Sequence, residues 1–291
     1  MCRFSLYLGD ELTVSSLVTE PANSIIHQSF HSHERIEPLN GDGFGLAWYA
    51  AEHTEPALFK EVNPAWNSFN LQSLARVTRT RCLLAHVRAA TPGLPVTQLN
   101  CHPFTSGRLA FMHNGELGGF RAVRRALLAQ LSDEAFHSVR GSTDSEHVFA
   151  LLLDRYGAHE DLAPLDRLAA ALEEAIGATE RLRARHGVAE PSQLNLCLGD
   201  GERAVASRFV SAGGEPSNTL YVHHGRRYEC VDGLCRMLPA GRRNRAVIVS
   251  SEPLSDDEGW QPVPENHLVL VDAGLGVTMR PIDLAHHLTT P

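Results

Sequence analysis

The second residue of the chain is a cysteine, and its position suggests a specific chemistry. Removal of Met1 would make Cys2 the first residue, with its thiol and a free α-amine on the same amino acid. An α-amine has a pKa of about 7.7–8.0, so it can take up a proton near neutral pH. A nucleophile activated by its own amine is an established means of acyl transfer and needs no separate histidine base. A cysteine that follows the initiator methionine is more often an ordinary buried residue than a nucleophile. The rest of the sequence must therefore decide between these two roles.

Two more segments carry groups that suit the two charges of an amino acid. Arg88 lies in the segment AHVRAAT at 85–91, and its planar guanidinium matches a carboxylate. Asp144 lies in GSTDSEH at 141–147, where its carboxylate can accept hydrogen bonds from an ammonium group. Taken singly, the arginine is also typical of a surface residue at a strand end, and the aspartate of a helix cap.

A third segment can stabilise a developing oxyanion. In HNGEL at 113–117, an apolar strand runs into an Asn-Gly pair. The side-chain amide of Asn114 is a donor, and the N–H of Gly115 is approachable because glycine has no Cβ. Together they can form an oxyanion hole, although such a pair alone is typical of a simple turn. The glycine-rich turn NGDGFG at 40–45 lacks the ending of a P-loop, and we expect it to pack beside the N-terminal residue.

Short apolar runs predict the strands that must position these residues. The Gly-Asp-Gly sequence at 199–201 separates two such runs and predicts a tight hairpin. The predicted strands are residues 82–87, 109–112, 194–198, 204–210, 219–223, 246–250 and 267–271.

Helices are predicted between the two groups of strands. Residues 120–131 are amphipathic, and apolar residues spaced three and four apart favour a helix over 165–185 that ends at Gly187. Thr143 and Glu146 form a capping-box pattern ahead of another apolar run. The order of strands, then helices, then strands favours an α+β fold of stacked sheets with helices outside them.

Taken together, the motifs resemble those of a known family in their order along the chain. MCRF at the start, NGDGFG at 40–45, AHVRAAT at 85–91, NCHPF at 100–104, HNGEL at 113–117 and GSTDSEH at 141–147 resemble class II glutamine amidotransferase domains. These are N-terminal-nucleophile hydrolases. The segment VSSEPL at 249–254 resembles one branch. That branch contains stand-alone bacterial proteins, the γ-glutamyl hydrolase of ergothioneine synthesis, and the amidotransferase-like subunit of the fungal glutathione-degrading complex.

The resemblance implies a fold and a set of roles. The fold is a four-layer αββα sandwich, formed here by a single domain over 1–291, with no cofactor and no metal. The implied site consists of Cys2 as nucleophile, Asn114 and Gly115 as the oxyanion-hole pair, Arg88 and Thr91 in the loop that binds the substrate carboxylate, Asp144 on the substrate amine, and His102 lining the site.

The implied activity is cleavage of the γ-amide of glutamine or of a γ-glutamyl compound, through a γ-glutamyl thioester on Cys2. Three alternatives stay open at this stage. The ammonia is delivered to a separate synthase or complex subunit, or a γ-glutamyl peptide or metabolite is hydrolysed without transfer, or the chain is a non-catalytic partner subunit.

Composition restricts the other classes of function. The formal net charge of −8 disfavours nucleic-acid binding, which depends on neutralising phosphates. No apolar run of about 18 residues predicts a membrane span, and the N-terminus lacks the pattern of a secretory signal. The six cysteines are not densely spaced, so we expect reduced thiols and a cytoplasmic location.

Two clusters raise the alternative of a metal site. His27, His31 and His33 are close in sequence but are not part of an HExxH pattern. Cys230 and Cys235, with the His-His pair at 223–224, do not have a standard zinc spacing. We interpret both clusters as ordinary polar or turn residues.

Overall fold

The computed structural model describes residues 2–34, 39–90, 93–213, 216–231, 234–239 and 245–284. Within these residues, two large sheets of seven and six strands and a separate two-stranded hairpin account for the β-structure. All strand pairs in the sheets are antiparallel. No helix in the described part of the chain combines the length and the apolar character that a membrane crossing requires.

The first sheet contains the strand that follows Cys2. Its strands, in spatial order, are β13 (Gln261–Pro262), β9 (Tyr221–Gly225), β12 (Ala246–Ser250), β1 (Arg3–Thr13), β4 (Arg79–Val87), β2 (Phe44–Trp48) and β3 (Ala57–Glu61). The elements on its outer face are α1 (Ser15–Val18), α2 (Ile25–Gln28), η1 (Ala65–Asn67), α3 (Phe69–Val77) and the hairpin of β10 (Arg227–Val231) and β11 (Leu234–Leu238).

The second sheet lies against the first and carries the Asn-Gly pair. Its strands, in spatial order, are β15 (Val277–Pro281), β14 (His267–Val271), β8 (Ala204–Arg208), β7 (Gln193–Gly199), β6 (Leu109–Glu116) and β5 (Phe104–Ser106). The remaining helices are η2 (Gln98–Asn100), α4 (Phe120–Leu128), α5 (Asp133–Ser138), α6 (Asp144–Ala158) and α7 (Pro164–Arg185).

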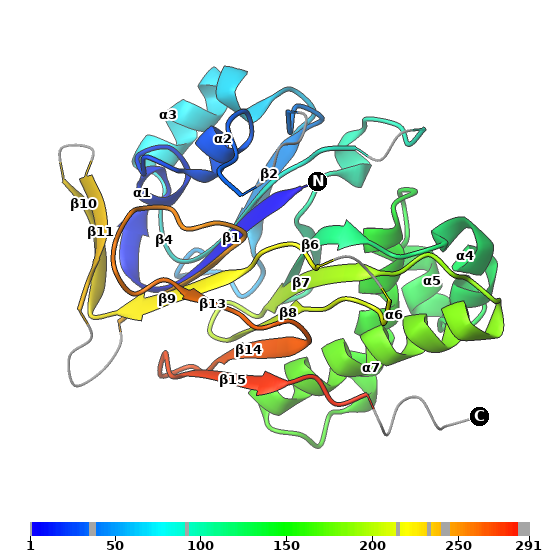
Figure 1. Ribbon diagram of the computed structural model, residues 1–291. Helices are drawn as coiled ribbons and strands as arrows, with labels where there is room; N and C mark the ends of the chain where they lie inside the picture. The colour runs from blue at the N-terminus through cyan, green and yellow to red at the C-terminus, as the bar shows by residue number, and fades with distance from the viewer. Residues whose placement is uncertain are drawn as a thin grey trace.

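Three apolar clusters hold these layers together. One lies between the sheets, one packs the first sheet against α1 and α3, and one packs the second sheet against α4, α6 and α7. Figure 1 shows the resulting order of helices, sheet, sheet and helices. The predicted four-layer αββα sandwich is therefore confirmed.

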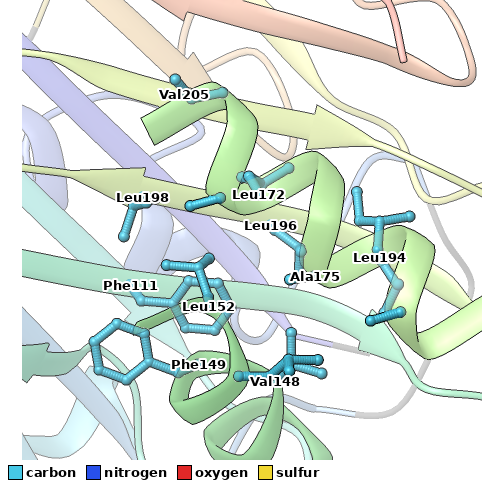
Figure 2. Packing of buried hydrophobic residues seen from close by; sticks show 14 of the residues in the cluster. Phe111, Val148, Phe149, Leu152, Leu172, Ala175, Leu194, Leu196, Leu198 and Val205 are labelled. Atoms are coloured by element: carbon cyan, nitrogen blue, oxygen red, sulfur yellow. The ribbon is translucent and has the colours of Figure 1, made fainter. Parts of the chain in front are cut away.

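Alternation along the strands explains how each sheet serves two clusters. In β7, the side chains of Leu194, Leu196 and Leu198 all point toward α6 and α7 (Figure 2), whereas Cys197 joins the cluster between the sheets. Figure 2 also shows Phe111 of β6 against Phe149 of α6, with stacked rings 5.2 Å apart. Successive side chains of a strand point to opposite faces of the sheet, so each strand can contribute to the clusters on both sides.

The same alternation places the N-terminus. In β1, Phe4, Leu6 and Leu8 face the second sheet, while Tyr7 and Leu12 face the outer layer. Full burial of such side chains contributes about 1.5–3 kcal/mol each, so β1 is firmly held between β12 and β4. Cys2 directly precedes this central strand, and its main chain is thereby fixed.

Several predicted elements are confirmed and some details are wrong. Strands 246–250 and 267–271 have the predicted bounds, and the hairpin at 199–201 joins β7 to β8. Thr143 caps α6 by accepting from the N–H of Glu146 at 3.2 Å. The reciprocal half of the capping box is absent, since the Glu146 carboxylate accepts from the N–H groups of residues 140 and 141 instead.

The expectation of six reduced cysteines is wrong for one pair. Cys230 and Cys235 lie opposite each other in the β10–β11 hairpin and form a disulfide. Direct pairing across a two-stranded ribbon brings the two sulfurs together, and a spacing of five residues along the chain did not indicate this. Cys2, Cys82 and Cys197 are among the free cysteines.

Candidate active site

Cys2 lies at the start of β1 with its thiol partly buried. Its Sγ is 3.6 Å from the carbonyl oxygen of Ala89, two residues after the end of β4. Burial raises the pKa of the Cys2 thiol; the positive charge of Arg88 acts to lower this pKa, and the negative charge of Asp144 acts to raise it. The predicted carboxylate-binding and amine-binding residues therefore both lie within electrostatic range of the sulfur.

Arg88 is a buried cation with little to neutralise it. Its side chain is only 3% exposed, and Nη1 donates to the carbonyl oxygen of Asp42 at 3.3 Å. No carboxylate in the described part of the chain pairs with it. The glycine-rich turn before β2 fixes its backbone, because the N–H of Arg88 donates to the carbonyl of Gly43 at 2.8 Å. A buried, unneutralised guanidinium is costly unless an anion completes it.

The glycine-rich turn at 40–45 packs closely against the segment at 101–102. A Cβ on Gly43 would lie 2.6 Å from the Cys101 sulfur, and one on Gly45 would lie 2.2 Å from the His102 carbonyl oxygen. Gly43 also has a φ of +110°, which side chains rarely adopt. The turn is thus closely packed, against Arg88, the carbonyl oxygen of Glu61 and the segment at 101–102. Packing beside the N-terminal residue itself stays a prediction.

Asp144 is the first residue of α6 and is held in a fixed orientation. One carboxylate oxygen accepts from the N–H of Leu117 and the other from the N–H of Ser145, each at 2.8 Å. Thr143, rather than Asp144, is the N-cap of α6. Asp144 lines a cavity of about 710 Å³ together with Glu116 and Arg121.

Asn114 and Gly115 end β6, directly opposite β7. The side chain of Asn114 is buried, its Nδ2 donates to the Ser251 hydroxyl at 3.4 Å, and its Oδ1 has no hydrogen-bond partner among the described residues. Gly115 has a φ of +154°, and a Cβ there would lie 1.8 Å from the carbonyl oxygen of Gln193. Only glycine fits at this position, because a side chain would collide with the neighbouring strand.

His102 lies in a group of buried histidines. Its ring centroid is 4.1 Å from that of His86, and neither of its ring nitrogens has a hydrogen-bond partner in the described structure. Burial lowers the pKa of His102 well below its ordinary value and the pKa of His86 to about 3, so both rings are neutral. His86 in turn contacts the main-chain oxygen of His113 at 3.1 Å and joins β4 to β6. Thr91, the other predicted binding residue, lies outside the described residues.

Three residues that the sequence did not single out fix the position of Cys2. Arg3 donates to the carbonyl oxygen of Cys2 at 2.9 Å and forms an ion pair of 2.8 Å with Glu252. Both of these side chains are buried. Ser251 accepts at its hydroxyl from the N–H of Phe4 at 3.0 Å, and the same hydroxyl contacts Asn114. The segment after β12 therefore ties the start of β1 to Asn114 of β6.

Hydrogen bonding keeps Glu252 ionised in this buried place. Burial acts to raise its pKa, but hydrogen bonds from Ser32 and Arg3 and the charge of Arg3 together hold it below the ordinary value. The stability that this shift contributes is present above a pH of about 4.3, the unfolded value, and is lost as the pH falls through the lower folded pKa.

Glu252→Gln is expected to destabilise the protein and to slow the reaction. Removing one partner of a buried ion pair costs about 3–5 kcal/mol of unfolding free energy. Because Arg3 then loses the group that orients it, kcat should fall more than KM rises. The matched control is Glu11→Gln, which breaks a pair with Arg79 that is 55% and 50% exposed, and should cost at most about 1 kcal/mol. Urea unfolding at pH 7 and pH 4 checks this, and an equal effect of both substitutions at pH 7 would contradict it.

The metal alternatives gain little from the geometry. His27, His31 and His33 do lie together. The ring centroid of His31 is 5.3 Å from that of His27 and 5.6 Å from that of His33. Among the described residues, the group with ligand atoms close enough to share an ion consists of Glu20, Cys230 and Cys235. Its two sulfurs are joined to each other, so neither is a thiolate ligand.

The two facing antiparallel sheets, with a cysteine at the head of a central strand, define an amidohydrolase of the N-terminal-nucleophile class. The family model for class II glutamine amidotransferases matches residues 14–289. The chain belongs to this family.

Curated relatives and solved structures agree with this assignment. The chain is 36% identical to the probable glutamine amidotransferase DUG3 of Saccharomyces cerevisiae, over 93% of this chain and 82% of that protein. It is 30% identical to the γ-glutamyl-hercynylcysteine sulfoxide hydrolase of Mycobacterium tuberculosis, over 98% of each. A glutamine aminotransferase class-II domain protein from Silicibacter pomeroyi superposes with a TM-score of 0.67 at 27% identity, over 97% of this chain and 100% of that one.

Proposed function

We propose that this enzyme hydrolyses the γ-amide bond of glutamine or of a γ-glutamyl compound, through a γ-glutamyl thioester on Cys2. The observation that carries the proposal is the buried guanidinium of Arg88, which no carboxylate of the described chain neutralises, within electrostatic range of the Cys2 thiol. The names of two relatives, an amidotransferase and a γ-glutamyl hydrolase, support the same class of substrate.

Binding uses the two charges at the α-carbon of the substrate. The α-carboxylate would neutralise Arg88, and the α-ammonium would donate to Asp144. With both ends of the amino-acid head held, a side chain of glutamine length extends its γ-carbonyl toward Cys2. This orientation supplies much of the rate, because it converts a bimolecular attack into one within a complex.

The chemical step needs a base, because burial raises the pKa of the Cys2 thiol and keeps it protonated at rest. In the processed chain the α-amine of Cys2 takes this proton as sulfur attacks the γ-carbonyl carbon. The amide of Asn114 and the N–H of Gly115 donate to the resulting oxyanion. The amine then passes the proton to the leaving nitrogen, the C–N bond breaks, and the thioester remains. Water attacks the thioester, releasing glutamate and the free thiol.

The fate of the leaving group is simple in this proposal. Glutamine releases ammonia, and a γ-glutamyl peptide or metabolite releases its amine, into the cavity or the solvent. No acceptor is required for turnover of the purified chain. Assay of glutamine, a γ-glutamyl dipeptide and an α-glutamyl dipeptide tests the proposal directly. We expect glutamate from the first two and none from the third, and hydrolysis of the α-linked peptide alone would overturn it.

Arg88→Lys is expected to weaken substrate capture strongly even though it conserves the charge. A lysine replaces the planar fork with a point charge and loses one charge-assisted hydrogen bond of about 1.5–3 kcal/mol, which lowers kcat/KM by about 10–150-fold. Most of the loss should appear in KM. Arg76→Lys, at an exposed position on α3, is the matched control and should leave both constants unchanged. An unchanged KM for Arg88→Lys would mean that this residue does not hold the carboxylate.

A further inference from the structure

Lys60 is the only lysine of the 291-residue chain, and arginine supplies every other position among the 26 Lys and Arg residues. It belongs to β3, the edge strand of the first sheet. Arginine and lysine serve equally as surface charges, but only lysine can lose its proton near neutral pH and act as a nucleophile. The reactivity of this one amine therefore depends on the groups that surround it.

The Lys60 side chain lines a cavity of about 610 Å³. The cavity lies between β3, the edge strand β5 of the second sheet, and α6. Phe59, Phe104 and Phe149 form its apolar walls. Arg140, Ser138 and Glu146 also line it, and the Glu146 carboxylate accepts from the N–H groups of residues 140 and 141. None of Cys2, Arg88, Asn114, Gly115 or Asp144 lines it, so this space is separate from the proposed catalytic residues.

The amine of Lys60 is poorly supported as a cation. Its Nζ lies 4.7 Å from the centroid of the Phe104 ring, and no hydrogen bond or ion pair joins it to any described residue. Burial lowers the pKa of Lys60 to about 8, although the charges of Cys101 and Glu146 act to raise it. Compared with an ordinary lysine of pKa about 10.4, on the order of 100-fold more of the amine is neutral at pH 7.5.

We propose that this cavity is a second ligand site, in which Lys60 captures an aldehyde that carries an aromatic or apolar body and an anionic group. The neutral amine attacks the carbonyl carbon, the proton moves from nitrogen to the oxygen, and loss of water leaves an imine. Water reverses the reaction, and no oxidant or reductant takes part. The phenyl rings accommodate the apolar body, and Arg140, which lines the same cavity, supplies the cation that pairs with the anion.

Trapping with a phosphorylated aromatic aldehyde tests this site in the full chain. Pyridoxal 5′-phosphate is added at pH 7.5, borohydride fixes the imine as a secondary amine, and peptide mapping locates the adduct. The Arg76→Lys variant provides the internal standard, because the lysine it introduces is exposed on α3. We expect Lys60 to be labelled at least about tenfold faster than that lysine, and to reach its limiting rate near pH 8–9. Equal labelling of the two lysines, or a modified N-terminal peptide with Lys60 unmodified, would overturn the proposal.

Arg140→Ala separates the role of the anion from that of the amine. Labelling by pyridoxal phosphate should fall several-fold in this variant, while labelling by uncharged benzaldehyde should not change. An equal response to both aldehydes would contradict the anionic part of the assignment. Because the readout is the mass of an adduct, it is independent of whether the chain hydrolyses γ-glutamyl amides. Lys60→Arg should abolish the adduct and leave that hydrolysis unchanged.

Discussion

Replacing Cys2 by alanine is expected to reduce γ-glutamyl amide hydrolysis by roughly 10⁴-fold or more, to the level of a protein with no nucleophile. The fold should survive, because Cys2 precedes β1 and contributes to none of the three apolar clusters. The measurement is glutamate release from glutamine and from a γ-glutamyl dipeptide, with circular dichroism to confirm folding. Cys197→Ala is the matched control, since this buried cysteine lies between the sheets and should affect stability only.

The proposed mechanism also requires that the α-amine of Cys2 be free. Protein that demonstrably retains Met1 should be inactive, because its Cys2 nitrogen lies in a peptide bond and cannot accept a proton. Cys2→Ser keeps the amine but offers a poorer nucleophile, and should retain at most a trace of activity. Full activity in Cys2→Ala, or in protein with Met1 in place, would show that another group attacks the substrate.

Asn114→Ala is expected to lower kcat by about 10²–10³-fold with little change in KM, which corresponds to about 2.7–4 kcal/mol of lost oxyanion stabilisation. In the proposed mechanism the amide of Asn114 acts on charge that appears only in the transition state, so substrate affinity should be preserved. Asn114→Asp keeps the shape of the side chain but replaces the donor with a carboxylate. It should be at least as impaired, because a negative group would then face the oxyanion.

Asn195→Ala provides the comparison for Asn114. Asn195 pairs with Asn114 across β6 and β7, is also buried, and donates to the carbonyl oxygens of Asn218 and Thr219. Its loss should lower the unfolding free energy and leave kcat of the folded protein nearly unchanged. Equal losses of kcat in the Asn114 and Asn195 variants would indicate a structural role for both. A rise in KM alone for Asn114→Ala would assign this residue to ground-state binding.

The sequence predicted those strands and helices whose own residues show an apolar run or a helical periodicity. β12 and β14 are apolar runs bounded by polar residues, and α7 has a long periodic face that ends near Gly187. β1 was not among the predicted strands, although its residues Phe4, Leu6 and Leu8 alternate with Ser5 and Tyr7. The hairpin of β10 and β11 was missed for a different reason, since its stability depends on packing against the outer layer.

Prediction of the site likewise succeeded only for residues whose own chemistry indicates a role. Residue types and spacing indicated Cys2, Arg88 and Asp144, because their side chains themselves suit the chemistry. Arg3 and Glu252 carried no such signal, since their ion pair joins residues 249 positions apart and exists only after folding. The segment at 249–254 resembled one branch of the family, but this resemblance did not indicate that the segment holds the first residue in place.

The proposed mechanism requires a covalent γ-glutamyl group on the first residue of the processed chain. The most direct measurement is peptide mass mapping of enzyme quenched in acid within milliseconds of mixing with a γ-glutamyl substrate. We expect the peptide that begins at Cys2 to gain the mass of one γ-glutamyl group, to lose it on treatment with hydroxylamine, and to remain unmodified in Cys2→Ser protein assayed alongside. A turning-over enzyme whose acyl group lies on any other residue, or that forms no acyl-enzyme at all, would contradict it.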